Sequence, residues 1–276
     1  MKGDRAALVV EARTRLITAL DDEVGDRLVH PGGKVDMYAD GCVVRPWDLL
    51  DRCPARVAHP VDDFEESARN VARRLGRLTL RRWSPPQPMG EAVDDLLSDR
   101  EDWPRGLREW FVGLDRAGVA PLRASTTSWA VGAARAVRGR PTRWVDRTMN
   151  VDVPGRMIRL AAGWDAQDAG RPTALLVMSD AVSSNRSRLI AGFSALACAL
   201  LTQTAPERVV VASAASGRST RVVVDDGLLS LTVDRVVDVV THRVEPELAP
   251  TQPGRWCDDC HLLNSCEDGL AALGEG

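Results

Sequence analysis

Three of the six cysteines fall within ten residues near the end of the chain. Cys257, Cys260 and Cys266 have the spacing C-x2-C-x5-C. Cysteines at such short intervals are typical of metal sites, because a tight turn can direct several thiolates at one centre. Three thiolates leave one position of a four-ligand site open. Cys53, directly before Pro54, is the best candidate for the fourth ligand, so the pattern predicts a metal centre that clasps the two ends of the chain together.

The cysteines alone leave the metal and the ligand set open. Four thiolates suit Zn²⁺ as well as iron. Cys42 is a second candidate for the distant ligand, although Cys53 with its following proline fits better. His261 lies between the tail cysteines and could coordinate, but a solvated surface histidine is the simpler interpretation. Cys198 lies within an apolar run and is predicted to be a small core residue.

The composition is that of a globular protein. The chain has 276 residues, of which 44% are hydrophobic and 27% charged, enough to bury a substantial core. No apolar run approaches the roughly 20 residues needed to span a bilayer, and the first residues do not match a signal peptide. We therefore expect a cytoplasmic protein, in which clustered thiols bind metal more often than they pair. The net charge is only -3, so a nucleic-acid role requires local basic surfaces.

Hydrophobic periodicity predicts an α/β protein whose elements would position these groups. We expect four segments, an N-terminal helix, hairpin and first ligand segment over 1–60, a helical region over 61–140, an α/β core over 141–245 and the cysteine tail over 246–276. The helical region is expected in pieces, interrupted at Gly118 and Pro121 among other positions. The predicted elements are helices at 4–26, 62–83, 185–201 and 228–243, hairpins at 35–45 and 144–165, and strands at 173–178, 208–212 and 220–224.

Arginine carries nearly all the positive charge, because Lys2 and Lys34 are the only lysines among 36 basic residues. Arg69, Arg73, Arg77 and Arg81 recur every fourth residue and share a helix face. Such a stripe is most often a solvated face, here with Glu65 and Glu66 as neighbours for pairing. The alternative is phosphate binding by the forked guanidinium groups.

The chain resembles the iron-sulfur branch of the PD-(D/E)XK nuclease superfamily, which includes RecB-like exonucleases, AddB-type nuclease domains and CRISPR-associated 4Fe-4S exonucleases. The resemblance rests on Cys53-Pro54 near the start, on Cys257, Cys260 and Cys266 at the end, and on the strand-helix core between them. It implies a restriction-endonuclease-like core, a mixed central sheet flanked by helices, with a helical insertion and a C-terminal iron-sulfur clasp. It further implies a 4Fe-4S cluster on these four cysteines.

The resemblance also implies where a nuclease site would lie. The family holds Mg²⁺ or Mn²⁺ with an aspartate at the end of one core strand and with the acid of a D/E-x-K motif on the next. Asp165 matches the first aspartate. On the next strand Met178 stands in the acid position and Asp180 in the lysine position, so the motif is degenerate. Asp165 and Asp180 remain candidate metal ligands, and Arg186 or Arg188 would have to supply the missing positive charge.

Arginine can stabilise phosphate charge, but its pKa is too high for it to act as a base. The expected function is therefore DNA binding with weakened or lost phosphodiesterase activity, in company with a helicase or nuclease partner. Two alternatives stay open, an active Mg²⁺- or Mn²⁺-dependent exonuclease and a structural or redox-sensing module without DNA affinity. Asp165 and Asp180 have a simpler interpretation as capping residues. Trp47, Trp83 and Trp256 are expected to pack beside the clasp rather than to stack on bases.

Overall fold

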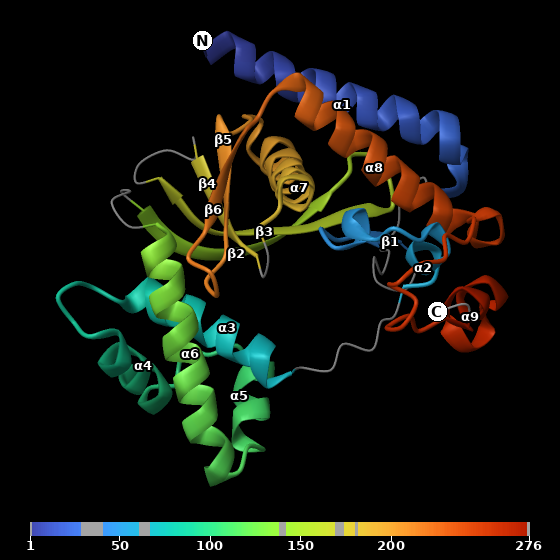
Figure 1. The fold of residues 1–276 in the computed structure, drawn as a ribbon. Coiled ribbons are helices and arrows are strands. Elements are labelled where there is room, and N and C mark those ends of the chain that lie inside the picture. Colours follow the sequence, from blue (N-terminus) through green and yellow to red (C-terminus); the bar gives the residue numbers. More distant parts are fainter. Residues whose placement is uncertain are drawn as a thin grey trace.

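The computed structural model describes residues 2–28, 41–60, 67–137, 142–168, 174–179 and 182–274. It is an α/β fold in which helices cover both faces of a mixed sheet (Figure 1). The helices are α1 Lys2–Val24, α2 Pro54–Ala58, α3 Ala68–Arg82, α4 Met89–Ser98, α5 Arg105–Val112, α6 Arg116–Ala136, α7 Ser184–Thr202, α8 Asp226–Val244 and α9 Glu267–Gly274. The strands are β1 Cys42–Val44, β2 Thr142–Asp152, β3 Ile158–Asp168, β4 Ala174–Met178, β5 Arg208–Ala212 and β6 Ser219–Val223.

The largest hydrophobic core lies between the sheet and the layer formed by α1, α7 and α8 (Figure 1). Helix α7 is almost entirely apolar from Ile190 to Leu200 and is buried all round, as its composition requires. It lies against α8 at Gly192, where an added Cβ would come within 2.0 Å of Thr232 Oγ1. Helix α1 and the strand-helix core therefore share one interior, since α1 contributes Val9, Leu16 and Leu20 to it.

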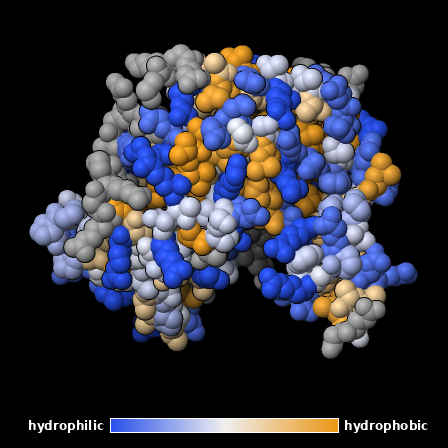
Figure 2. All heavy atoms as spheres, turned by 45° about the horizontal axis from the view of Figure 1, so that its top comes forward, coloured by the Kyte–Doolittle hydropathy of each residue, from blue (hydrophilic) through white to orange (hydrophobic). Residues whose placement is uncertain are grey.

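Helices α3 to α6 form an insertion on the opposite face of the sheet (Figure 1). They enclose a small core of their own, in which Trp103 and Phe111 meet edge to face with ring centroids 5.2 Å apart. Ser67 caps the N-terminus of α3, where its hydroxyl accepts the Asn70 N–H, and Asp115 caps that of α6, where its carboxylate accepts the Gly118 N–H. Figure 2 shows the face that carries α1 and α8. Most of this surface is hydrophilic, and hydrophobic side chains are exposed between the hydrophilic ones.

Most elements predicted from the sequence are confirmed, and the predicted interruption of the helical region at Gly118 and Pro121 is wrong. Helix α6 runs through both positions even though Pro121 removes one backbone hydrogen bond inside the helix. The Asp115 cap before it and the buried side chains after it, beginning with Leu122, stabilise the helix. Residues 35–40 of the predicted hairpin and 62–66 of the predicted helix lie outside the described residues. Of the described helices, none is both long and apolar enough to cross a lipid bilayer.

The sheet is split along one edge of β3. Strand β2 pairs with β3 from Arg159 to Asp168 on the other edge, with one bulge, while β1 pairs only with Ile158–Leu160 and β4 only with Ala166 and Gln167. Among the described strands, none pairs with the intervening edge at 161–165. Strand β1 runs parallel to β3 and β4 antiparallel to it, so the carboxyl ends of both point into the gap. After β1 and after β4 the polypeptide leaves the sheet at this gap, in opposite directions. Open α/β sheets bind ligands at such a point, outside the carboxyl ends of two strands whose connections diverge.

Candidate nucleic-acid cleft and cysteine clasp

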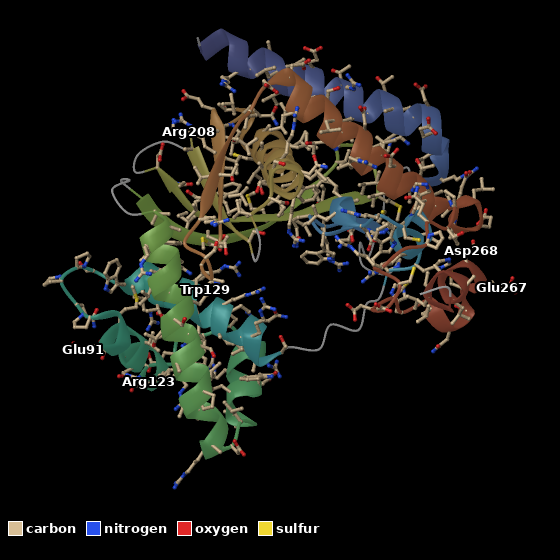
Figure 3. The ribbon with its side chains drawn as sticks, in the orientation of Figure 1. Glu91, Arg123, Trp129, Arg208, Glu267 and Asp268 are labelled. Carbon is tan, nitrogen blue, oxygen red and sulfur yellow. The ribbon has the colours of Figure 1, made fainter. Side chains whose placement is uncertain are left out.

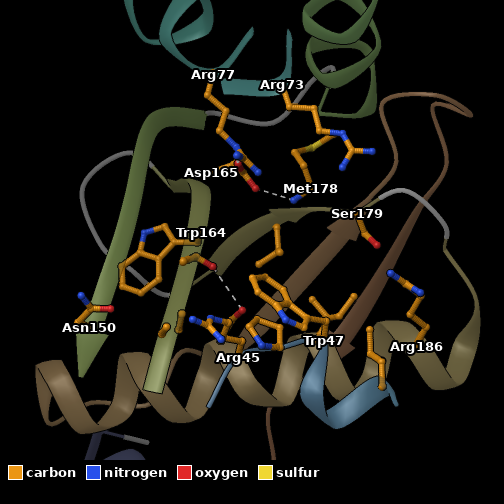
Figure 4. A pocket seen from close by; sticks show the side chains of 18 of the residues that line it. Arg45, Trp47, Arg73, Arg77, Asn150, Trp164, Asp165, Met178, Ser179 and Arg186 are labelled. Atoms are coloured by element: carbon orange, nitrogen blue, oxygen red, sulfur yellow. Dashed lines mark hydrogen bonds and ion pairs between the residues drawn. The ribbon is translucent and has the colours of Figure 1, made fainter. Parts of the chain in front are cut away.

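A cleft of about 590 Å³ opens at the split in the sheet. Its floor is the β3 segment at 161–165, and its walls come from both layers of helices. On one side lie α3 and Trp129 of α6, where the insertion meets the sheet (Figure 3). On the other side lie the segment Arg45–Trp47 after β1 and the start of α7 (Figure 4). The cleft therefore passes between the two helical layers rather than lying on one face.

Asp165 is buried at the bottom of this cleft, with 5% of its side chain exposed. Its Oδ1 is paired with the Arg77 Nε, and its Oδ2 accepts the backbone N–H of Met178 over 2.6 Å (Figure 4). Trp164, Asp165 and Ala166 are buried in succession, opposite a β-bulge in β2 that shifts the pairing between Trp144 and Arg147. Both carboxylate oxygens thus have partners, and one of these partners is a guanidinium.

The expectation that Asp165 ends its strand or caps a turn is wrong, because β3 continues to Asp168. Met178 ends β4, and its half-buried side chain packs against the insertion. Asp180 lies outside the described residues. Arg186 lines the cleft from the first turn of α7, whereas Arg188, although exposed on the same helix, is not among the residues that line it.

The cleft is basic and aromatic. Arg73 and Arg77 project into it from α3, and Arg45 and Arg186 lie opposite them (Figure 4). The Arg77 guanidinium lies 5.7 Å from the centre of the Trp129 ring, and Arg45 lies 5.8 Å from that of Trp47. Two members of the α3 stripe thus face the cleft rather than bulk solvent.

Trp47 is 60% exposed at the mouth of the cleft. The expectation that it packs beside the clasp is therefore wrong. Trp83 also lies elsewhere, at the end of α3, where its indole N–H donates to the Gln87 carbonyl over 2.7 Å. Of the three tryptophans, Trp256 alone lies in one of the two segments that carry the candidate ligand cysteines, next to Cys257. Its indole N–H donates to the Gln252 carbonyl over 2.9 Å.

A buried ion pair fixes the wall that carries Arg45 and Trp47. Arg243 of α8 lies 3.0 Å from Asp48, and both side chains are more than 90% buried. Arg243 also donates to the carbonyl oxygens of Val43 in β1 and Val57 in α2. Asp48 in turn accepts the Arg45 N–H over 2.6 Å. One guanidinium therefore attaches the whole segment from β1 to α2 to helix α8. Burial raises the pKa of the Asp48 carboxyl, and the Arg243 guanidinium opposes this rise only in part.

The end of the chain folds back against the segment that carries Cys53. The Ala55 N–H donates to the Pro250 carbonyl over 3.3 Å, and His261 Nε2 lies 2.7 Å from the His59 carbonyl oxygen. The Arg52 guanidinium lies 5.1 Å from the centre of the Trp256 ring. We call the two contacting segments, residues 51–59 and 250–269, the clasp.

Three of the four clasp cysteines accept backbone N–H groups at sulfur. The donors are Gln252 to Cys53 (3.5 Å), Gly254 to Cys257 (3.4 Å) and Gly269 to Cys266 (3.4 Å). The same kind of bond stabilises thiolates in iron-sulfur sites. In the part of the chain that the structure describes, however, no three His, Cys, Asp or Glu side chains are close enough together to hold a metal. The segments are thus adjacent and their donor set suits a metal, but the sulfurs do not surround one point.

The remaining cysteines lie outside the two clasp segments. Cys42 is buried in β1, where burial raises the pKa of its thiol and the Arg243 guanidinium lowers it only in part. Cys198 is fully buried in α7, as expected of a core residue. His261 is exposed.

Sequence reasoning missed two residues that shape the site. In the sequence Arg77 is only one of the four stripe members, and Arg243 belongs to no motif. Both are arginines that pair with a buried aspartate from a distant part of the chain, Asp165 and Asp48. A buried aspartate requires a partner, but the sequence does not say which of 34 arginines provides it. No protein-family model matches the chain, and no curated protein matches its sequence.

Proposed function

We propose that the protein binds DNA in the cleft at the split of the sheet and that its phosphodiesterase activity is weakened or lost. The observation that carries the proposal is the state of Asp165, which lies at the bottom of a basic cleft and is already paired with Arg77 and the Met178 N–H. A metal-dependent nuclease needs carboxylate oxygens free to hold its cation. Here a guanidinium occupies the place of that cation.

The cleft still suits a phosphodiester chain. Arg45 and Arg186 line it from the wall opposite α3, and no ion pair formed within the described residues includes either of them. Guanidinium groups bind phosphate oxygens in pairs of parallel hydrogen bonds. The exposed Trp47 beside Arg45 offers an aromatic surface to a base. In this role the arginines hold the backbone, Trp47 contacts a base, and Arg77 keeps Asp165 from repelling the phosphates.

We further propose that Cys53, Cys257, Cys260 and Cys266 hold a 4Fe-4S cluster, with Zn²⁺ as the alternative. The proposal is supported by the contact between the two cysteine segments and by the N–H groups directed at three of the sulfurs. When bound, such a group supplies a cross-link between distant segments. The chain's own contribution is to present four thiolates from two turns and to shield them.

Incubation of end-labelled DNA with Mg²⁺ or Mn²⁺ tests the loss of hydrolysis. We expect the protein to retard the DNA in a native gel while the label stays at full length, with Asp165→Ala behaving like the unchanged protein. Metal-dependent shortening that Asp165→Ala abolishes would instead establish the active exonuclease. Intact DNA without any retardation would refute DNA binding and favour the alternative of a structural or redox-sensing module.

A further inference from the structure

A second cavity of about 570 Å³ adjoins the cleft on the side of the clasp. It lies between the turn at Asp48–Leu50, the start of α7, α8 and the loop from Gln252 to Trp256. Leu50 and Arg186 line both cavities. The two spaces are therefore neighbours along one route, which leads from the split in the sheet, past Arg186, to the surface of the clasp.

The acidic residues of this second cavity are already balanced. Asp48 pairs with the buried Arg243, Asp51 lies 3.3 Å from Arg56, and Asp238 lies 3.5 Å from Arg235. Two further arginines, Arg52 and Arg186, line the same cavity and take part in no ion pair formed within the described residues. The lining of the second cavity, taken together with its ion-pair partners, therefore carries an excess of positive charge.

Arg52 is held in place at the far end of the route. Its guanidinium lies 5.1 Å from the centre of the Trp256 ring, an arrangement that orients the planar group without neutralising it. Trp256 itself is fixed by its bond to the Gln252 carbonyl and by Gly254, where an added Cβ would come within 2.7 Å of the ring. An exposed arginine on a fixed aromatic support is suited to hold an anion.

We propose that a nucleic-acid strand bound in the cleft continues over the clasp, with successive contacts from Arg45, Arg186 and Arg52 to its phosphates. This inference rests on the proposed function and names the second half of its binding surface. Trp256 acts as a positioning residue, because it orients Arg52 and its ring is already covered by Arg52 and Gly254. A single strand suits the route, since its backbone can turn from the interior of the cleft onto the outer surface of the clasp.

Fluorescence anisotropy with oligothymidylates of about 4 and about 16 nucleotides tests the proposal, since these lengths bracket typical single-stranded sites. The variants are Arg52→Ala and Arg52→Gln, the latter because it keeps a planar group near the indole. Arg255→Ala is the matched control, as it removes the same charge from an exposed neighbour of Trp256 that lines neither cavity. Circular dichroism confirms that each variant is folded.

We expect both Arg52 variants to weaken binding of the longer strand about tenfold at low salt, the scale of one charge-assisted contact. The salt dependence, plotted as log K against log salt concentration, should become shallower by about 0.7, the value for one phosphate of a single strand. Binding of the short strand should not change. Trp256→Ala should weaken the longer strand less, and Trp256→Phe should restore it, because phenylalanine still supports the guanidinium.

If Arg52 and Arg255 variants bind the longer strand alike, the route over the clasp is refuted while DNA binding in the cleft stands. The same holds if Arg52→Ala weakens short and long strands equally. Absence of binding by the unchanged protein to either strand refutes the proposed function itself, and the inference with it. Comparison of the short and the long strand thus distinguishes failure of the route over the clasp from failure of DNA binding in the cleft.

Discussion

At the scale of single residues, the pair between Arg77 and Asp165 decides the chemistry of the cleft. An aspartate that is 5% exposed is costly to leave charged without a partner, and Arg77 supplies that partner from a helix 88 residues away in sequence. Both oxygens of the Asp165 carboxylate therefore have partners, the Arg77 Nε and the Met178 N–H. A single contact therefore stabilises the buried carboxylate and, under the proposed function, leaves it no free oxygen for a cation.

Arg77→Met should lower the free energy of unfolding by about 3 kcal/mol, because it leaves Asp165 buried without its cation. The double variant Arg77→Met with Asp165→Asn should recover most of that loss, since the amide carries no charge and still accepts the Met178 N–H. Urea denaturation of both single variants and the double variant measures this coupling. Additive losses would show that the two side chains do not interact in solution.

Cys42 gives a pH-dependent prediction at the same scale. Burial raises the pKa of its thiol, so the folded state holds this proton more tightly than the unfolded state. The contribution of the thiol to stability is complete below the unfolded pKa of about 8.5 and is lost as pH rises through the folded value. The stability difference between the unchanged protein and Cys42→Ala should therefore shrink between pH 7.5 and 10, as measured by denaturation at both values. A constant difference would contradict the assignment.

At the scale of elements, the hydrophobic pattern determined most of what is seen. Strand β5 has the bounds predicted for it, and the hairpin of β2 and β3 covers the predicted range 144–165 and extends a few residues beyond it at both ends. The split of the sheet was not predictable, because it depends on β1, a strand of three residues that pairs with β3 more than 100 residues later. Short parallel pairings leave no local signal, since their partner is set by tertiary packing.

The close approach of α7 and α8 is a second feature of the elements that can be tested. Gly192→Ala would place a methyl group 2.0 Å from Thr232 Oγ1, which is itself held by a bond to the Leu228 carbonyl. The helices must then separate, and we expect a loss of about 1–3 kcal/mol in thermal or chemical unfolding. The control is Gly106→Ala in α5, where nothing lies within 4 Å of the added methyl and stability should hold or rise.

At the scale of the whole molecule, one segment links the cleft to the clasp. Residues from β1 to α2 carry Arg45 and Trp47 at one end and Cys53 at the other, and Arg243 holds them to α8 through Val43, Asp48 and Val57. The structure brings residues 51–59 into contact with residues 250–269, the two segments that carry the four cysteines. The gathering of the four sulfurs at one centre stays a prediction.

Arg243→Met should therefore destabilise the protein by roughly 3–5 kcal/mol, because it leaves Asp48 buried and unpaired. Arg235→Met, on an exposed face of the same helix, should change stability by less than about 0.5 kcal/mol. Guanidinium denaturation of both variants measures the difference. Equal effects would mean that the buried pair does not hold the segment.

Metal content tests the clasp at the same scale. Purified anaerobically, the protein should be brown and contain iron, and Cys53→Ser should lose that iron while keeping its secondary structure. Cys42→Ser serves as the control, since Cys42 lies in β1 beside Arg243 rather than in the clasp. A colourless protein that contains zinc would contradict the iron-sulfur cluster and support Zn²⁺ as the bound metal.

The most direct measurement of the central claim is a salt-dependent anisotropy titration of labelled DNA. The double variant Arg45→Ala with Arg186→Ala removes two charges from the cleft, and Arg105→Ala with Arg255→Ala removes two from exposed positions that do not line it. We expect saturable binding by the unchanged protein that weakens as salt rises, a loss of tenfold or more in the cleft variant, and little change in the control. Binding that is absent, or that falls equally in both double variants, would contradict a nucleic-acid site at the split of the sheet.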